Sequence, residues 1–412
     1  MLTGVTRVHH RAGPVRSTPD FRAVEHRFEV PLAPGDDRRV ELFARELRSP
    51  DHADEERPYL VMLNGGPGSA NLRPERPQAW LARALRDYHV VLLDQRGTGL
   101  SSPVTAQTLP RLGADAAAQA DMLKHFRADA IVRDAEHVRR ALLGDERWST
   151  LGQSFGGFIT LTYLSFAPEG VTEAFITAGV PSLHRPAEDV YRATYRRLEA
   201  RLDEYFARYP DDRAIWEEVV AIDRRHQALG MDLGMIPGLE RLHYLAESAF
   251  AAPGELSAPF LEEARRRHDH TASPLFAVLH EAIYAQGRAT AWAAQRVLDE
   301  RGAEPLLLTE MVLPWHFEAE PSLRPFAAVA ELLAHADDWP ALYDPAQLAR
   351  NEVPVVAAIY SRDVYVESAF SLETAEEVRG MRTWVSGELH HDGIHMGPEV
   401  LDRLIRMRRD EL

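Results

Sequence analysis

The sequence predicts an α/β fold, in which helices cover both faces of a mostly parallel sheet, with a helical cap domain inserted into it. In the first part of the chain, short apolar runs typical of buried strands alternate with helical segments. Residues 182–352 then look helical almost throughout, and a buried-strand pattern returns at 353–363. We therefore divide the chain into a first part of the core (1–181), a helical cap (182–352) and a second part of the core (353–412).

The first part of the core begins with two strand-like pieces, at 21–30 and 38–48, joined by the turn sequence PLAPGDD. The apolar run at 59–63 ends in the glycine-proline loop NGGPGS, and the run at 89–94 ends in the similar loop RGTGLSS. Helical spacing at 77–88 separates the two runs. Glycine-rich loops at strand ends are where such sheets bind ligands.

The next elements repeat this alternation. Apolar residues recur at helical steps between 128 and 143, and the short strand WSTLG follows. The sequence LGQSFGGF (151–158) then leads into a helix, and AFITAGVP (174–181) reads as another buried strand. After the cap, residues 382–387 form a weaker strand candidate, and an amphipathic helix over 398–412 closes the chain.

Composition excludes several classes of function. The net charge of −16 argues against nucleic acid or an anionic membrane surface as a partner. The absence of cysteine excludes disulfides, thiolate metal sites and cysteine nucleophiles. The first 20 residues lack the apolar stretch of a signal peptide, and no apolar run approaches the ~20 residues of a membrane helix. We expect a cytoplasmic enzyme.

Ser154 is the candidate nucleophile. Gly152, Ser154 and Gly156 fit the pattern G-x-S-x-G, in which the serine occupies a strained turn between a strand and a helix. The predicted strand before the motif and the predicted helix after it supply that context. The alternative is a glycine-rich loop without chemistry.

A serine nucleophile needs a histidine base and a carboxylate that orients the base. Asp363 lies just beyond a predicted strand, and His390, His391 and His395 follow in a glycine-bounded loop, so the order Ser, Asp, His is that of G-x-S-x-G hydrolases. The alternatives are a turn or capping role for Asp363 and a metal site at His391 and His395. Because Gly393 lies between these histidines and further ligands are lacking, we expect no metal and no cofactor.

The loop NGGPGS is the candidate oxyanion site, because acyl transfer requires backbone N–H donors. Phe155, directly after the nucleophile, supplies one donor, and Gly65-Gly66 is suitably placed to supply another. We interpret Asp94 and Arg96 as structural residues that form ion pairs beneath the site.

Together, G-G-P-G, D-Q-R-G-x-G-x-S and G-Q-S-F-G-G resemble the prolyl aminopeptidase (proline iminopeptidase) family of α/β-hydrolases. Segments such as LHEAIYAQGRATAWAAQRV and RDVYVE are similar to the longer-chain branch of that family. The branch resembles E-x-x-H-x-G at its last loop, which Glu388, His391 and Gly393 fit, so the resemblance implies that His391 is the base. Asn64 departs from the pattern, because many members carry histidine there.

The resemblance implies a serine aminopeptidase that releases an N-terminal residue from short peptides or aminoacyl amides, with proline as the residue expected. Ser154 would form the acyl-enzyme, with His391 and Asp363 completing the triad and Gly66 and Phe155 holding the oxyanion. The alternatives are a capped esterase or amidase that acts on small non-peptide substrates, and a binding protein with this fold. The sequence leaves the oligomeric state open.

An aminopeptidase must also bind a protonated α-amine, for which a poorly hydrated carboxylate is a suitable partner. In the cap, Glu281 and Glu310 each lie in an otherwise apolar stretch. We expect at least one of them to face Ser154 and favour Glu281. The alternative for each is an internal ion pair with a cap arginine such as Arg288 or Arg296.

Overall fold

A mixed sheet of ten strands forms the centre of the core in the computed structural model, which describes residues 8–412. The strand order is β1-β3-β4-β6-β5-β7-β8-β11-β12, and β2 pairs with β3. Pairing is antiparallel from β1 to β6 and parallel from β6 through β12. Residues 1–7 lie outside the described residues. They belong to the first 20 residues, in which we expected no signal peptide.

The strands are β1 (His9–Ala12), β2 (Arg16–Ser17), β3 (Arg22–Pro31), β4 (Arg39–Arg48), β5 (Tyr59–Leu63), β6 (His89–Asp94), β7 (Trp148–Gln153), β8 (Val171–Thr177), β9 (Phe250–Ala252), β10 (Glu255–Leu256), β11 (Val355–Tyr360) and β12 (Met381–Ser386). The helices of the core are α1 (Ala79–Ala84), α2 (Ala116–Leu123), α3 (Ala128–Leu143), α4 (Phe155–Phe166), α14 (Ser368–Glu377), α15 (Gly393–Met396) and α16 (Glu399–Arg408). The helices between β8 and β11 are α5 (Ala187–Arg208), α6 (Asp212–Ile222), α7 (Gly238–Glu247), α8 (Ala258–His268), α9 (Leu275–Leu279), α10 (Ala293–Arg301), α11 (Pro314–Ala319), α12 (Ala327–Ala334) and α13 (Pro345–Leu348).

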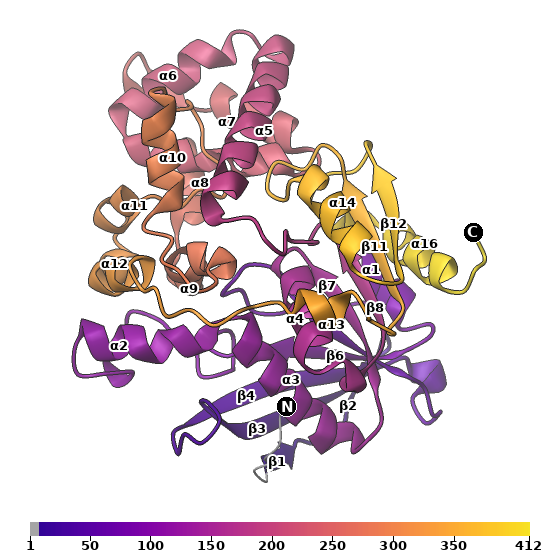
Figure 1. Cartoon of the computed structure of the whole chain (residues 1–412). Coiled ribbons are helices and arrows are strands. Elements are labelled where there is room, and N and C mark those ends of the chain that lie inside the picture. Colours follow the sequence, from indigo (N-terminus) through magenta and orange to yellow (C-terminus); the bar gives the residue numbers. More distant parts are fainter. Residues whose placement is uncertain (1–7) are drawn as a thin grey trace.

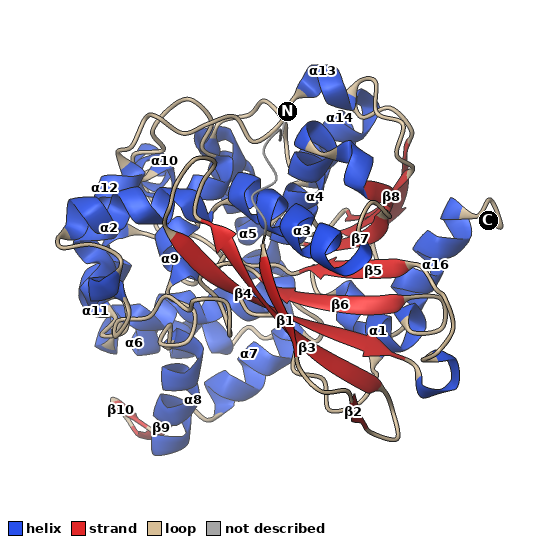
Figure 2. Ribbon diagram, turned by 90° about the horizontal axis from the view of Figure 1, so that it is seen from below, coloured by secondary structure: helices blue, strands red, loops and turns tan. Residues whose placement is uncertain are grey.

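Helices cover both faces of the sheet, as the apolar strands require. Every residue of β6, β7 and β11 is buried. Figure 2 shows α3 and α4 on one face and α1 and α16 on the other, and each pair contributes to a separate hydrophobic cluster with the sheet. The helical stripe predicted between 128 and 143 is α3, whose Ile131, Ala135 and Val138 are buried against the sheet. The predicted α/β class with a mostly parallel sheet is confirmed.

The segment between β8 and β11 lies above one edge of the sheet (Figure 1). Its helices α5 to α8 and α10 share a hydrophobic core of their own, which includes Tyr205 and Trp216. In contrast, α9 and α12 belong to the same hydrophobic cluster as the core helices α3 and α4. The hairpin β9–β10 was not predicted, because strands of three and two residues are too short to show an alternating pattern.

The parallel strands end under this helical segment. The loops after β5, β7, β11 and β12 all leave the carboxyl edge of the sheet, which is the edge where α/β folds bind ligands. Within residues 8–412, no helix is both long enough and apolar enough to cross a membrane.

Candidate active site

Ser154 lies at a sharp turn between β7 and α4. Its backbone has φ 54° and ψ −124°, a left-handed conformation that is uncommon for a residue with a side chain. A Cβ on Gly156 would lie 1.8 Å from the carbonyl oxygen of Leu63, and a Cβ on Gly152 would lie 2.4 Å from the carbonyl oxygen of Gly156. The two glycines of the motif are therefore required by close backbone contacts, and the turn presents Ser154 above the sheet.

Asp363 and His391 form a buried hydrogen-bonded pair. The distance from His391 Nδ1 to Asp363 Oδ2 is 2.8 Å, and the two residues are 4% and 2% exposed. Asp363 Oδ1 accepts the backbone N–H groups of Tyr365 (2.8 Å) and Val366 (3.2 Å). These two backbone donors hold the carboxylate, whose Oδ2 accepts a hydrogen bond from the Nδ1–H group of His391. The Nε2 atom is then free to accept a proton.

The strand register brings the serine toward this pair. Ser154 follows β7, Asp363 follows β11 and His391 follows β12, so all three lie at the same edge of the parallel strands. β8 joins the two sides: Ser154 donates its N–H to Thr177, and Ala178 donates its N–H to Ala358 of β11, at 3.0 and 3.1 Å. The residues of the described chain form no hydrogen bond with the hydroxyl of Ser154.

The environment of His391 determines its proton affinity. Burial alone would lower the pKa of this histidine. The charge and hydrogen bond of Asp363 outweigh burial, with a further contribution from the charge of Glu310, so the pKa lies above its ordinary value of 6.5. His390 and His395 differ, because burial lowers the pKa of both and neither is bonded to Asp363. The three neighbouring histidines are thus electrostatically distinct.

The loop after β5 lies against the serine turn. A Cβ on Gly65 would lie 3.1 Å from Cβ of Ser154, and Gly66 has a φ of +129°. Phe155 is the first residue of α4, where backbone N–H groups have no intrahelical partner. The structure thus places Gly65 and Phe155 beside Ser154, with Gly66 next in the same loop, and their role as an oxyanion site stays a prediction.

Asn64 has a clear structural role in this loop. Its Nδ2 donates to the carbonyl oxygen of Ala70 (2.9 Å), and its own carbonyl accepts a hydrogen bond from Gln95 Nε2 (2.9 Å). The side chain thus closes the loop that carries the glycines, while Gln95 fixes the loop to the end of β6.

The ion pairs predicted beneath the site are present. Asp94 pairs with Arg73, and its Oδ1 also accepts the backbone N–H of Asn71 at 3.1 Å. Arg96 forms a buried bidentate pair with Asp134, at 2.6 and 2.7 Å. Both pairs hold the loop after β6 and confirm the structural interpretation of Asp94 and Arg96.

Glu281 is occupied by backbone donors. It begins the short 3-10 helix η6 (Glu281–Tyr284), and its carboxylate accepts the N–H groups of Ala293 (3.0 Å) and Ala294 (2.8 Å) at the start of α10. The cavity that Glu281 borders has a volume of about 10 Å³, room for one water molecule at most. The partner is therefore the backbone of a helix rather than Arg288 or Arg296, and Arg296 instead pairs with Glu188.

The carboxylate of Glu310, in contrast to that of Glu281, has no hydrogen-bond partner among the described residues. The carboxylate is only partly exposed, and it accepts no hydrogen bond from residues 8–412. Burial raises its pKa to about 7, the charge of Asp363 adds to this increase, and the charge of His391 opposes it. An unpaired carboxylate that interacts electrostatically with His391 and Asp363 lies close to the predicted catalytic residues.

Aromatic rings connect the serine turn to the helical segment between β8 and β11. Phe155 contacts Phe158 at a ring-centroid distance of 6.1 Å, Phe158 contacts Tyr284 at 5.9 Å, and Tyr284 contacts Tyr191 at 6.0 Å. Tyr284 thereby places η6 against α4, the helix that begins after Ser154. The sequence analysis did not identify Tyr284 or Tyr191, and their only signal was their position in apolar helical segments of the cap.

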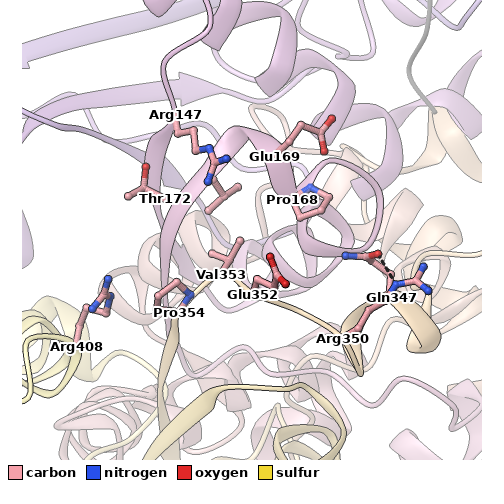
Figure 3. A pocket seen from close by; sticks show the side chains of 11 residues that line it. Arg147, Pro168, Glu169, Thr172, Gln347, Arg350, Glu352, Val353, Pro354 and Arg408 are labelled. Carbon is pink, nitrogen blue, oxygen red and sulfur yellow. Dashed lines mark hydrogen bonds between the residues drawn. The ribbon is translucent and has the colours of Figure 1, made fainter.

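A separate cavity of about 560 Å³ lies at the opposite edge of the sheet (Figure 3). Its lining includes Arg147, Thr172 and Pro354, which lie where β7, β8 and β11 begin. None of the predicted site residues lines this cavity, so it is distinct from the candidate active site. In the chain from residue 8 onward, no group of three His, Cys, Asp or Glu side chains is arranged to hold a metal ion.

Comparisons with known proteins agree with this architecture. The family model described as the alpha/beta hydrolase fold matches residues 58–241. The proline iminopeptidase of Aeromonas sobria is 43% identical over 411 residues, which cover 93% of this chain and 96% of that protein. Proline iminopeptidase aneH of Aspergillus aculeatus is 35% identical, covering 95% of this chain and 94% of its own. The chain therefore belongs to the proline iminopeptidase family of α/β-hydrolases.

Proposed function

We propose that this chain is a serine aminopeptidase that releases the N-terminal residue from short peptides and aminoacyl amides, with proline as the preferred residue. The observation that carries the proposal is the unpaired, poorly hydrated carboxylate of Glu310, which interacts with the His391–Asp363 pair. A hydrolase acting on neutral esters has no use for such a carboxylate. An aminopeptidase needs one for the substrate ammonium group.

The proposed chemistry follows the serine triad. Ser154 Oγ attacks the carbonyl carbon of the first residue while His391 Nε2 accepts the hydroxyl proton. The N–H groups of Phe155 and Gly66 stabilise the oxyanion, and Gly65 lines the substrate site beside Ser154. His391 then protonates the leaving amine, and water attacks the resulting acyl-enzyme. Throughout, the Nδ1–H group of His391 donates its hydrogen bond to the carboxylate of Asp363, and the proton stays on the imidazole.

We assign recognition of the substrate amine first to Glu310. Its pKa of about 7 falls when an ammonium group binds beside it, so the carboxylate is ionised in the complex. Glu281 supports the same region by holding the start of α10, and its buried carboxylate is the second candidate for contact with the amine. We thus rank Glu310 before Glu281, whereas the sequence favoured Glu281.

Proline as the first residue is supported by the names of the two full-length relatives, both called proline iminopeptidases. The rings of Phe158, Tyr284 and Tyr191 are a suitable apolar wall for a compact ring. We further propose that residues 182–352 act as a cap that limits access to short peptides with a free N-terminus. The protein is proposed to act in the cytoplasm without a cofactor.

A panel of chromogenic substrates tests the proposal. It contains prolyl and other aminoacyl p-nitroanilides, their N-acetylated forms and simple p-nitrophenyl esters. The proposal requires hydrolysis of the free prolyl amide, and its loss in Ser154→Ala. Turnover of esters alone would support the esterase alternative, and no turnover together with no adduct with a serine-reactive phosphonate would support a binding protein.

A further inference from the structure

Three hydrogen bonds connect one cap segment, residues 231–236, to the surroundings of His391. The hydroxyl of Tyr365 donates to the carbonyl oxygen of Met231. The backbone N–H of His391 itself donates to the carbonyl oxygen of Gly234 (3.1 Å). The N–H of Ile236 donates to the carboxylate of Asp392, at 3.1 and 3.2 Å from its two oxygens. Two of these bonds are donated by core residues and one by the cap, and all three fall within six residues of the cap.

Tyr365 also contacts the predicted general base directly. Its ring packs edge-on against the His391 ring, with centroids 4.7 Å apart and an interplanar angle of 87°. Its backbone N–H is one of the two that hold Asp363. A Cβ on Gly234 would lie 2.2 Å from the Tyr365 ring, so the cap segment approaches this ring as closely as a glycine allows.

The cap segment is itself firmly held. It includes the end of the 3-10 helix η5 (Arg224–Gly234), whose Leu233 is buried in the hydrophobic core of the cap. Arg201 of α5 donates from Nε to the carbonyl oxygen of Leu233 at 3.0 Å. Residues 231–236 are therefore anchored in the cap as well as bonded to the α/β core.

We propose that cap segment 231–236 positions His391, so that the general base is in place only when the cap is docked on the core. Tyr365 and Asp392 are the positioning residues that transmit this restraint. The inference rests on the proposed function in that it takes His391 as the base. It assigns to the cap a role in the chemistry itself, in addition to selecting the substrate.

The restraint is needed because His391 lies in a loop after β12, before the single-turn helix α15. Its side chain has one anchor, Asp363, and the bond to Gly234 fixes its backbone. Reactive groups must be held within about 0.5 Å of the productive geometry, and a displacement of about 1 Å can cost on the order of 100-fold in rate. A cap that moves away would release both the backbone of His391 and the ring of Tyr365.

Three variants test the inference in steady-state hydrolysis of prolyl p-nitroanilide. Tyr365→Phe removes one bond and keeps the ring, and Asp392→Ala removes another. Asp392→Asn is the conservative control, because its amide oxygen still accepts from Ile236. We expect kcat to fall by about 10- to 100-fold in the first two with KM little changed, and to recover in Asp392→Asn.

The pH profile provides a separate readout. The charge of Asp392 raises the pKa of His391, so Asp392→Asn should shift the acidic limb of the profile to lower pH while retaining kcat. Tyr205→Phe is the control for cap stability. Its hydroxyl bonds to Asp212 and Trp216 inside the cap and has no contact with the histidine loop. We expect this variant to lower the melting temperature and leave kcat unchanged.

Unchanged kcat in Tyr365→Phe and Asp392→Ala would overturn the inference, as would a loss of kcat in Tyr205→Phe equal to theirs. The rate at which a phosphonate modifies Ser154 separates this inference from the proposed function, since that reaction needs the base but no substrate amine. If the parent enzyme leaves prolyl amides intact yet reacts with the phosphonate, the aminopeptidase proposal fails. The same variants must then slow phosphonylation by a similar factor, and an unchanged rate would overturn the inference.

Discussion

Replacing Glu310 by glutamine should stabilise the unliganded protein while damaging turnover. Burial raises the pKa of Glu310 from 4.5 to about 7. A carboxyl whose pKa is raised on folding contributes its full stability below pH 4.5, and this contribution is lost as the pH rises through 7. The shift of about 2.5 pH units, at about 1.4 kcal/mol per unit, corresponds to about 3 kcal/mol above pH 7. Glutamine avoids this cost because it does not ionise.

Urea unfolding at pH 5 and pH 8 measures this effect. Glu310→Gln should exceed the parent protein in free energy of unfolding by up to about 3 kcal/mol at pH 8, with a much smaller difference at pH 5. The same variant should lose on the order of 100-fold in kcat/KM for prolyl p-nitroanilide, because a charge-assisted hydrogen bond contributes about 1.5–3 kcal/mol. A small neutral ester should be spared.

Glu281→Gln is the matched control, since this carboxylate is bonded to the N–H groups of Ala293 and Ala294. Burial also raises the pKa of Glu281, but the bonds to Ala294 and Ala293 oppose this rise, so Glu281→Gln should gain less stability between pH 5 and pH 8 than Glu310→Gln. If Glu310→Gln were less stable than the parent at pH 8, Glu310 would have a protein partner, and the reasoning that frees it for the substrate amine would be refuted.

Further predictions concern the triad, the pH profile and the serine turn. Ser154→Ala should lose on the order of 10⁶ in kcat with the fold intact, and His391→Gln should be similarly impaired. Substitutions of His390 or His395 should be mild. An inactive His390 variant together with an active His391 variant would assign the base to His390. Because the raised pKa of His391 means that the base is protonated below its pKa, kcat/KM should rise with pH through a group titrating above 6.5, and a pH-independent rate from 5 to 8 would contradict this assignment. Gly156→Ala should prevent stable folding, as its Cβ would lie 1.8 Å from a backbone oxygen, and a melting temperature equal to that of the parent would show that the turn can relax.

Local patterns were sufficient to predict the serine turn and most strands of the core, whereas the short strands β1 and β2 and the helices α2 and α14 were not predicted. The strands β5, β6, β7 and β11 are apolar runs bounded by glycine or polar residues, and the requirement for glycine at 152 and 156 follows from a turn that is local in sequence. Asp363 was predicted because it follows a strand and precedes a loop with three histidines, and His391 was chosen among these by the resemblance to the family's E-x-x-H-x-G pattern. Their order along the chain then matched the order of the hydrolase triad.

The cap was harder to predict because its contacts are long-range. The sequence around Glu281 shows only its helical neighbours. Its hydrogen-bond partners are Ala293 and Ala294, which lie 12 and 13 residues later at the start of α10. The raised pKa of Glu310 likewise reflects burial and the charges of Asp363 and His391, which are distant in the sequence. Asp392 stands next to His391 in the sequence, yet its contact is with Ile236, 156 residues away.

The central claim is that a free N-terminal amine is recognised beside Ser154. It is tested most directly by kcat/KM at pH 8 for prolyl p-nitroanilide and for N-acetylprolyl p-nitroanilide with the parent enzyme. Acetylation removes the ammonium charge and leaves the scissile bond unchanged. We expect the free substrate to be preferred by about 10- to 150-fold, which corresponds to the ~1.5–3 kcal/mol of a charge-assisted hydrogen bond. Equal values for the two substrates would contradict it and favour a capped amidase.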